Sequence, residues 1–224
     1  MLVIALDPPF GPSGEYSGLK IVEETSAYAV SYKVGLLLVL ESGPEVIRAI
    51  KETSGKRVIV DFKLADIGDI MVRVLRKLAE SGANAVIAHG FVGVGDGVEK
   101  LVEEARMLGV DVILVTAMSH RGSRKYLDKH FEELLADALE LGVHGVVVPA
   151  TRPWLIERAR KAVKDELKIY APGVGVQGAE PGSALCAGAD YEIVGRYIVR
   201  SPDPGKIARE VYEAQLRSVR TCRG

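Results

Sequence analysis

The sequence predicts an α/β protein, a single-domain (β/α)8 TIM barrel that takes in residues 1–224 as one domain. Eight short apolar runs rich in Val and Ile alternate with longer amphipathic stretches. The apolar runs are continuous, which is typical of parallel strands that are covered on both faces. The length is near that of one closed barrel, and no linker, low-complexity tract or charge block divides the chain.

The first half of the chain contains four strand–helix units. Strands are expected where Val, Ile, Ala and Leu predominate, at residues 2–6, 28–34, 58–62 and 84–88. The helices that follow them are expected at residues 18–26, 43–53, 66–81 and 98–108. Pro44 suits the first turn of the second helix. Ile70, Val74 and Leu78 share one face of the third helix, and Gly82 supplies its C-cap.

The second half repeats the same alternation. Its strands are expected at residues 111–116, 145–148, 167–171 and 191–194. Its helices are expected at residues 131–141, 153–163, 183–187 and 204–217. Residues 121–129 read as a polar loop. We expect Tyr126, Trp154 and Tyr197 to serve as packing residues.

The composition argues against several classes of protein. The formal net charge is −1 with His neutral, so the chain lacks the basic excess of a general nucleic-acid or membrane-surface binder. The longest apolar run near the N-terminus, residues 34–40, is too short to cross a bilayer, and no signal peptide is visible. Cys186 and Cys222 form no C-x-x-C pair, so we expect no disulfide framework. These features indicate a cytoplasmic protein without nucleic-acid or membrane partners.

Unusual polar residues follow the predicted strands at their C-terminal ends. In a (β/α)8 barrel the active site is built at this rim, from the loops that leave the strands. The sequence therefore predicts a site composed of residues that are far apart in the chain. The rim residues are Asp7, Lys33, Asp61, Lys63, His89, Ser119, Gln177 and Arg196.

The third predicted strand leads into Asp61, Lys63 and Asp66. Alternate residues of an extended strand share a face, so Asp61 and Lys63 are expected to point the same way. Together with Lys33 these groups make two cations and two anions that hold one another ionised. Lys63 is then an acid that can donate a proton, and not a free amine for a Schiff base. An ion network that only ties two strands together is the alternative.

The segment 172–182 is rich in glycine and follows the seventh strand. Loops after strands seven and eight are the usual phosphate site of this fold. Glycine lets backbone N–H groups approach an anion, Arg196 can bind phosphate oxygens, and Gln177 can add a donor. A flexible loop with an ordinary surface Arg is the alternative. The segment also has the letters of a dinucleotide fingerprint, which we reject because no long helix or acidic residue follows at the required spacing.

No metal site is expected. The four His residues, at positions 89, 120, 130 and 144, lack a close ligand spacing. Asp61 and Asp66 could hold Mg²⁺, but Lys33 and Lys63 would compete with the ion. Ser119 has no partner arrangement for nucleophilic catalysis, so a hydrogen bond to a polar ligand or a loop cap is its expected role.

Six motifs occur in order along nearly the whole chain: Ile4-Ala-Leu-Asp7, Lys33-Val-Gly35, Val60-Asp-Phe-Lys-Leu-Ala-Asp-Ile67, Thr116-Ala-Met-Ser-His120, Pro172-Gly-Val-Gly-Val-Gln-Gly178 and Ile193-Val-Gly-Arg196. Together they resemble orotidine 5′-phosphate decarboxylase in its compact archaeal form. The Asp-x-Lys-x-x-Asp element also resembles that of a wider superfamily with Mg²⁺-dependent sugar-phosphate members. Those members typically carry Glu at the end of strand two, where this chain has Lys33.

The resemblance implies a role for each matching position. Asp7 binds ribose hydroxyls, and Lys33 reaches the ribose and braces Asp61, which lies beside the substrate carboxylate. Lys63 donates the proton to C6 of the pyrimidine, and Asp66 comes from the partner subunit of a homodimer. The remaining implied contacts are Ser119 to the pyrimidine amide and, in the lid and phosphate site, Pro172, Gly173, Val174, Gly175, Gln177, Gly178, Gly195 and Arg196.

The resemblance implies decarboxylation of orotidine 5′-monophosphate to UMP without a cofactor, in pyrimidine biosynthesis. The alternatives are a Mg²⁺-dependent sugar-phosphate lyase or decarboxylase of the same superfamily, and a non-catalytic nucleotide-phosphate binder. Two positions depart from the family pattern. Gly68 stands where Pro is common, and Ile70 stands where a Thr hydroxyl usually contacts the ligand across the dimer.

Overall fold

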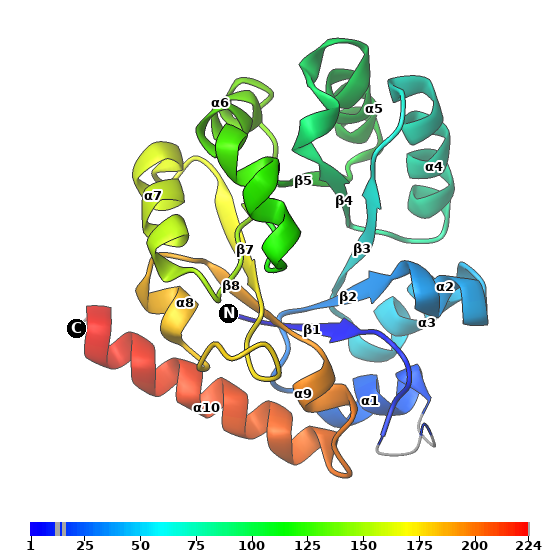
Figure 1. Cartoon of the computed structure of the whole chain (residues 1–224). Coiled ribbons are helices and arrows are strands. Elements are labelled where there is room, and N and C mark those ends of the chain that lie inside the picture. Colours follow the sequence, from blue (N-terminus) through cyan, green and yellow to red (C-terminus); the bar gives the residue numbers. More distant parts are fainter. Residues whose placement is uncertain (12–13, 15–16, 224) are drawn as a thin grey trace.

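The computed structural model describes residues 1–11, 14 and 17–223, and its eight parallel strands close into a barrel (Figure 1). Each strand pairs with the next one in the chain, and β8 pairs with β1. The predicted (β/α)8 barrel is therefore confirmed. The strands are β1 (Leu2–Leu6), β2 (Ser31–Gly35), β3 (Arg57–Leu64), β4 (Ala85–His89), β5 (Asp111–Val115), β6 (Gly145–Val147), β7 (Lys168–Pro172) and β8 (Tyr191–Val194).

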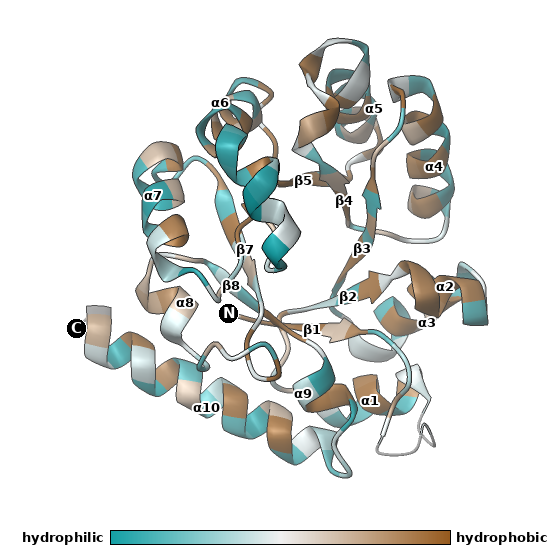
Figure 2. Ribbon diagram, in the orientation of Figure 1, coloured by the Kyte–Doolittle hydropathy of each residue, from teal (hydrophilic) through white to brown (hydrophobic). Residues whose placement is uncertain are grey.

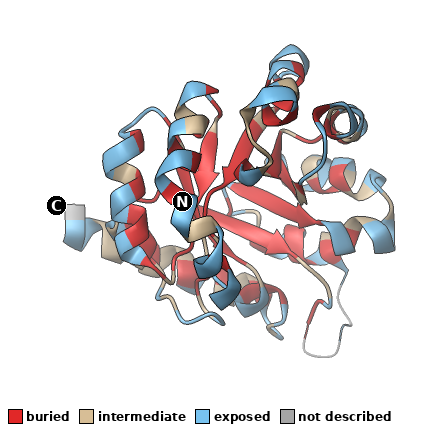
Figure 3. Ribbon diagram, turned by 45° about the horizontal axis from the view of Figure 1, so that its top comes forward, coloured by how far each residue is buried: buried red, intermediate tan, exposed pale blue. Residues whose placement is uncertain are grey.

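Helices surround the barrel and keep their polar faces outward (Figures 2 and 3). The α-helices are α1 (Gly18–Thr25), α2 (Leu36–Ser42), α3 (Glu45–Ser54), α4 (Gly68–Glu80), α5 (Glu99–Leu108), α6 (Phe131–Glu140), α7 (Pro153–Val163), α8 (Ser183–Cys186), α9 (Arg196–Val199) and α10 (Pro204–Arg223). Short helical turns lie at η1 (Gly90–Val92), η2 (Val94–Val98), η3 (Arg121–Lys125) and η4 (Leu127–His130). Among the described residues, no helix has the length and apolar character needed to span a bilayer.

Two apolar layers explain why the strands are buried along their length. In β1, Leu2, Ile4 and Leu6 belong to the layer between strands and helices, whereas Val3 and Ala5 belong to the layer inside the barrel. This alternation follows from the two-residue period of a strand. Because both faces are covered, the strands have no polar face, and the sequence reads as continuous apolar runs.

Two short helices were not predicted. The apolar run at residues 36–40 forms α2, which ends at Gly43 with φ 77°, a backbone conformation that favours glycine. Leu36, Leu37 and Leu40 are exposed and Leu38 is buried, so this helix presents much of its apolar surface to solvent. The second unpredicted helix is α9, which follows β8 directly.

The cysteines correct a prediction. Cys186 and Cys222 form a disulfide with their Cα atoms 5.8 Å apart, although no disulfide was expected. The predicted last helix ended at residue 217 and left Cys222 in a polar tail. Instead α10 continues to Arg223 and packs along α8, so the end of one helix reaches the end of the other (Figure 1). Disulfides are uncommon in a reducing cytoplasm, so the cysteines no longer support that location.

Candidate active site

The strand register places the charged residues inside the barrel mouth. Lys33 of β2 is level with Ala5 and Ile59, and Asp61 of β3 is level with Ile87. Ala5, Ile59 and Ile87 all belong to the layer inside the barrel. Since side chains level with one another on neighbouring strands point to the same face, Lys33 and Asp61 also point inward.

Asp61 is the centre of an ion network. Its Oδ2 lies 3.1 Å from Lys33 Nζ and 2.8 Å from Lys63 Nζ, and its Oδ1 accepts a second hydrogen bond from Lys63 at 2.9 Å. Lys33 Nζ also lies 3.5 Å from Asp7 Oδ2. The side chains of Asp61 and Lys33 are only 7% and 9% exposed, so these charges are held in place largely by one another.

Burial and pairing act in opposite directions on this network. Burial alone would raise the pKa of the Asp61 carboxyl, but the charges and hydrogen bonds of Lys33 and Lys63 outweigh it and hold that pKa below its usual value. Burial alone would lower the pKa of Lys33, and Asp61 and Asp7 outweigh it and raise that pKa. Asp61 is therefore an anion and Lys33 a cation at neutral pH.

Lys63 contacts Asp61 through a backbone conformation that differs from the predicted one. An extended strand was expected here, but Lys63 has φ 47° and the pairing of β3 with β4 shifts register between Asp61 and Leu64. A left-handed backbone at a residue other than glycine costs about 1–2 kcal/mol. Such strain concentrates at functional sites. The bulge turns the Lys63 ammonium back toward Asp61.

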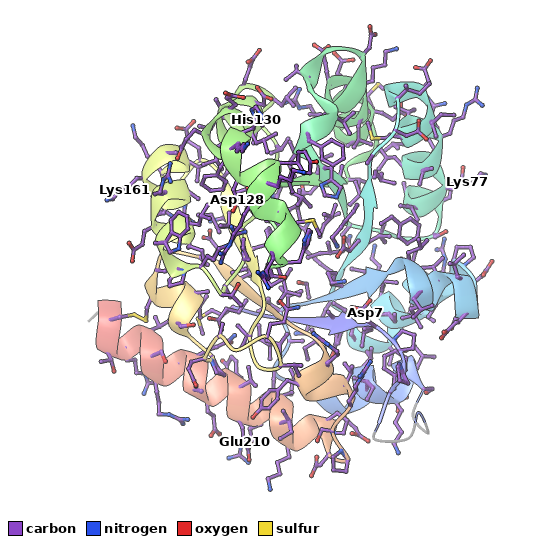
Figure 4. The ribbon with its side chains drawn as sticks, in the orientation of Figure 1. Asp7, Lys77, Asp128, His130, Lys161 and Glu210 are labelled. Atoms are coloured by element: carbon purple, nitrogen blue, oxygen red, sulfur yellow. A yellow bond between two sulfur atoms is a disulfide. The ribbon has the colours of Figure 1, made fainter. Side chains whose placement is uncertain are left out.

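Gly35 makes room for Asp7. A Cβ at Gly35 would lie 2.1 Å from Asp7 Oδ1, so any side chain there would displace the carboxylate. Figure 4 shows Asp7 at the end of β1, whereas the labelled Lys77 and Lys161 lie on outer helices. The glycine at the end of β2 thus fixes where the Asp7 carboxylate can lie.

A cavity of about 350 Å³ opens over this network. Its floor is apolar, and is formed by interior side chains such as Ile87, Val115 and Ile193. The predicted site residues that line it are Asp7, Lys33, Asp61, Lys63, Ser119, Pro172, Gly173, Val174, Gln177, Gly195 and Arg196. The cavity therefore has the ion network after β1 to β3, an apolar floor, and the glycine-rich loop with Arg196 after β7 and β8.

The glycine-rich loop is folded on itself. Gly175 N donates to Ala179 O at 2.9 Å, and Gly178 N donates to Gly175 O at 2.8 Å. Gly175 and Gly178 have φ 81° and 99°, which explains why glycine occupies these positions. Neither residue lines the cavity, so in this conformation their N–H groups hold the loop in shape.

Asp66 is the predicted catalytic residue that lies apart. It is exposed, does not line the cavity, and its Oδ1 accepts a hydrogen bond from Ile67 N at 2.7 Å. The neighbouring Ile67 is 65% exposed. A single copy of the chain therefore brings together Lys33, Asp61 and Lys63 but not Asp66.

Sequence analysis missed the group that fixes the Ser119 loop. The buried Arg152 binds both Met118 O and the Asp128 carboxylate, and Ser123 Oγ donates to Asp128 Oδ1 at 2.8 Å. Met118 N in turn donates to Ser123 Oγ at 3.1 Å. In the sequence, the signal of this network is Arg152 directly before Pro153, the first residue of α7. An Arg in that position is too common to predict a buried network.

The cavity's carboxylates offer little to a metal ion. Among the described residues, no three His, Cys, Asp or Glu side chains gather in a way that could hold a metal. Both oxygens of Asp61 already accept hydrogen bonds from Lys63. His89 lies nearby, and burial together with the Lys63 charge lowers its pKa. Its Nδ1 is buried without a hydrogen-bond partner in the described structure.

Comparison with known proteins gives one consistent result. A sequence model of the Orotidine 5′-phosphate decarboxylase / HUMPS family matches residues 1–211. The chain is 40% identical over 213 residues to orotidine 5′-phosphate decarboxylase of Pyrococcus abyssi, covering 95% of this chain and 98% of that one.

Solved structures agree with the sequence comparison. Orotidine 5′-phosphate decarboxylase from Pyrococcus horikoshii superposes with a TM-score of 0.86 at 37% identity, covering 96% of this chain and 99% of that one. The enzyme from Methanocaldococcus jannaschii, complexed with the inhibitor BMP, gives 0.88 at 36% identity, with 96% and 97% covered. The chain belongs to the orotidine 5′-phosphate decarboxylase / HUMPS family.

Proposed function

We propose that this chain decarboxylates orotidine 5′-monophosphate to UMP without a cofactor, with Lys63 as the proton donor to C6. The observation that carries the proposal is the Lys63 ammonium, which hydrogen-bonds both Asp61 oxygens at 2.8 and 2.9 Å at the cavity wall. The cavity has the ion network at one end, an apolar floor, and Arg196 with the glycine-rich loop at the other end. These would accommodate the carboxylate, the pyrimidine ring and the phosphate of the substrate, respectively. A role in pyrimidine biosynthesis leads us to infer a cytoplasmic location.

The chemistry needs a fixed cation. When the bond from C6 to the carboxylate breaks, CO₂ leaves and the electron pair stays on C6, in an in-plane orbital that the ring cannot delocalise. The Lys63 ammonium stabilises this carbanion and then transfers a proton to it, forming the C6–H bond and leaving a neutral amine that solvent reprotonates. Lys63 is suited to both tasks because Asp61 fixes its position.

Asp61 and Lys33 prepare the site. The buried Asp61 carboxylate would lie beside the substrate carboxylate, and repulsion between them is relieved as CO₂ departs. Lys33 keeps Asp61 ionised and positioned through its 3.1 Å contact. Closure of the glycine-rich loop over the phosphate would exclude water from the reacting centre.

We further propose a homodimer in which Asp66 enters the partner's site. Six exposed apolar residues follow β2, β3 and β4 at the same rim of the barrel as Asp66, namely Leu36, Leu37, Leu40, Ile67, Ile70 and Phe91. Such a grouping of exposed apolar side chains on one side of a protein is typical of an interaction surface.

The test follows the loss of orotidine 5′-monophosphate absorbance by the purified protein in the presence of a chelator. Turnover at undiminished rate with chelator is expected. No turnover, or turnover only after Mg²⁺ is added, would contradict a cofactor-free decarboxylase. Tight binding of UMP without any turnover would support a nucleotide-phosphate binder.

A further inference from the structure

Two arginines of one helical turn face the same cavity. Arg196 begins α9 and Arg200 caps its C-terminus, and both line the cavity together with Tyr197. Residues four apart in a helix lie on one face, so both side chains leave this turn on the side of the cavity that they line. Only Arg196 was predicted as a site residue.

Within the part of the chain that the structure describes, neither arginine is neutralised by a carboxylate. No carboxylate among the described residues forms an ion pair with Arg196 or Arg200, although many other arginines are paired, as Arg76 is with Glu104. Two like charges four residues apart in a helix repel each other and destabilise it by roughly 0.2–0.5 kcal/mol. An anionic ligand between them would remove that repulsion.

The charges of the cavity indicate which anion fits. The described residues that line it include four cations, Lys33, Lys63, Arg196 and Arg200, and two anions, Asp7 and Asp61. Asp7 and Asp61 pair with the two lysines at one end, which leaves a charge of +2 at the α9 end. A phosphate monoester carries about −1.5 to −2 at pH 7.

The glycine-rich loop lies directly against this turn. A Cβ on Gly175 would be 2.7 Å from Tyr197 Cβ, so the loop backbone rests on the tyrosine that stands between the two arginines in sequence. Tyr197 is 44% exposed, so the loop covers it only in part. The loop and α9 thus form two sides of one positively charged part of the cavity.

We propose that Arg200 is a second phosphate-binding residue, which acts with Arg196 to select dianionic phosphate monoesters. The proposal rests on the proposed function, since it takes the phosphate of the nucleotide as the ligand. A second guanidinium adds charge-assisted hydrogen bonds to oxygens that Arg196 and Gln177 leave free. Arg200 is exposed, so its substitution should leave the barrel intact.

The experiment compares the binding of UMP and uridine to the wild-type protein, Arg200→Ala and Arg200→Lys by calorimetry at low and high salt. Arg200→Ala should weaken UMP binding about tenfold at low salt, reduce its salt dependence, and leave uridine binding unchanged. Arg200→Lys should recover part of the loss. The control Arg220→Ala removes the same charge from an exposed position of α10 outside the cavity, and should match the wild type.

The outcomes separate this proposal from the proposed function. UMP affinity within twofold of the wild type in Arg200→Ala would overturn the role of Arg200, even if the enzyme turns over orotidine 5′-monophosphate normally. Absence of turnover in the wild type, combined with weaker binding of UMP but not of uridine to Arg200→Ala, would overturn the proposed function and support the phosphate subsite. Equal weakening of UMP and uridine would also contradict the proposal, because the effect would not depend on phosphate.

Discussion

Asp61 joins two ammonium groups, and its own side chain is only 7% exposed. Removing one partner of a buried ion pair costs about 3–5 kcal/mol, because the other charge is left uncompensated. The stability of the network and its chemistry therefore depend on the same carboxylate. Lys63, at the more exposed end of the network, is the member that can meet a substrate.

Asp61 should give the protein a pH-dependent stability. Folding lowers the pKa of the Asp61 carboxyl. The stability that this charge contributes is therefore complete above the pKa of an ordinary aspartate, and it is lost as the pH falls through the lower pKa of the folded state. We expect Asp61→Asn to be less stable than the wild type at pH 7, and the difference to shrink below about pH 4. Urea unfolding of both proteins from pH 3 to 7 measures the difference in their unfolding free energies. A difference that is constant across this range would contradict the role given to the Asp61 charge.

Local packing explains why glycine occupies position 68. A Cβ at Gly68 would lie 2.5 Å from the backbone O of Asp96, and Lys100 bridges Asp69 and Asp96 at 3.1 and 3.3 Å. The first turn of α4 therefore packs too closely on the η2 segment for a larger residue. The structure gives no comparable explanation for Ile70, which is 38% exposed.

Among the elements, α10 supports the base of the glycine-rich loop. The fully buried Glu192 accepts hydrogen bonds from Gly182 N and Ala184 N, and from Gln215 Nε2 of α10 at 2.9 Å. Burial raises the pKa of Glu192. The disulfide between Cys186 and Cys222 links the ends of α8 and α10 covalently. The end of the loop is thus held by both a buried carboxylate and a covalent link.

The disulfide should contribute measurably to stability. It closes a loop with a sequence separation of 36, for which the chain-entropy relation gives about 3–4 kcal/mol. Adding reductant should lower the unfolding free energy of the wild type by an amount up to this value. Cys222→Ser should be as unstable as the reduced wild type and should not respond to reductant. A wild type whose denaturant midpoint ignores reductant would show that the link contributes nothing.

For the whole molecule, the proposed homodimer predicts that each site is completed by Asp66 of the partner subunit. If each site takes Asp66 from its partner, Lys63→Ala and Asp66→Ala should each be nearly inactive. After unfolding and refolding together in equal amounts, half of the dimers should be mixed, and one of the two sites in each should be intact. The mixture should recover about a quarter of the wild-type activity. A mixture no more active than its components, in a protein that sediments as a monomer, would contradict a shared site.

The barrel could be predicted from the sequence because its strands are buried on both faces and its polar residues collect at one rim. The short helices α2 and α9 could not, since their few residues follow strands directly and carry little periodicity of their own. The pairing of Cys186 with Cys222 depended on six further residues of α10, and helix ends are the least reliable part of a sequence prediction.

The charged residues of the candidate site could be predicted from the sequence, but the backbone geometry that brings them together could not. Lys33, Asp61 and Lys63 were found because charged residues at the ends of apolar strands are conspicuous. The left-handed backbone of Lys63 could not be foreseen, because only the bulge between β3 and β4 requires it. Arg200 lay outside the predicted site because it lies beyond the end of β8, and only the turn of α9 brings it to the cavity.

The most direct measurement is the rate of orotidine 5′-monophosphate decarboxylation by Lys63→Ala under single-turnover conditions, with UMP affinity measured alongside. Lys63→Ala should lose on the order of 10⁴-fold or more in rate and keep its UMP affinity within about tenfold, since the ammonium acts on the carbanion and not on the bound product. Lys161→Ala, which changes an exposed lysine of α7, should match the wild type. A rate within tenfold of the wild type would show that Lys63 does not protonate C6.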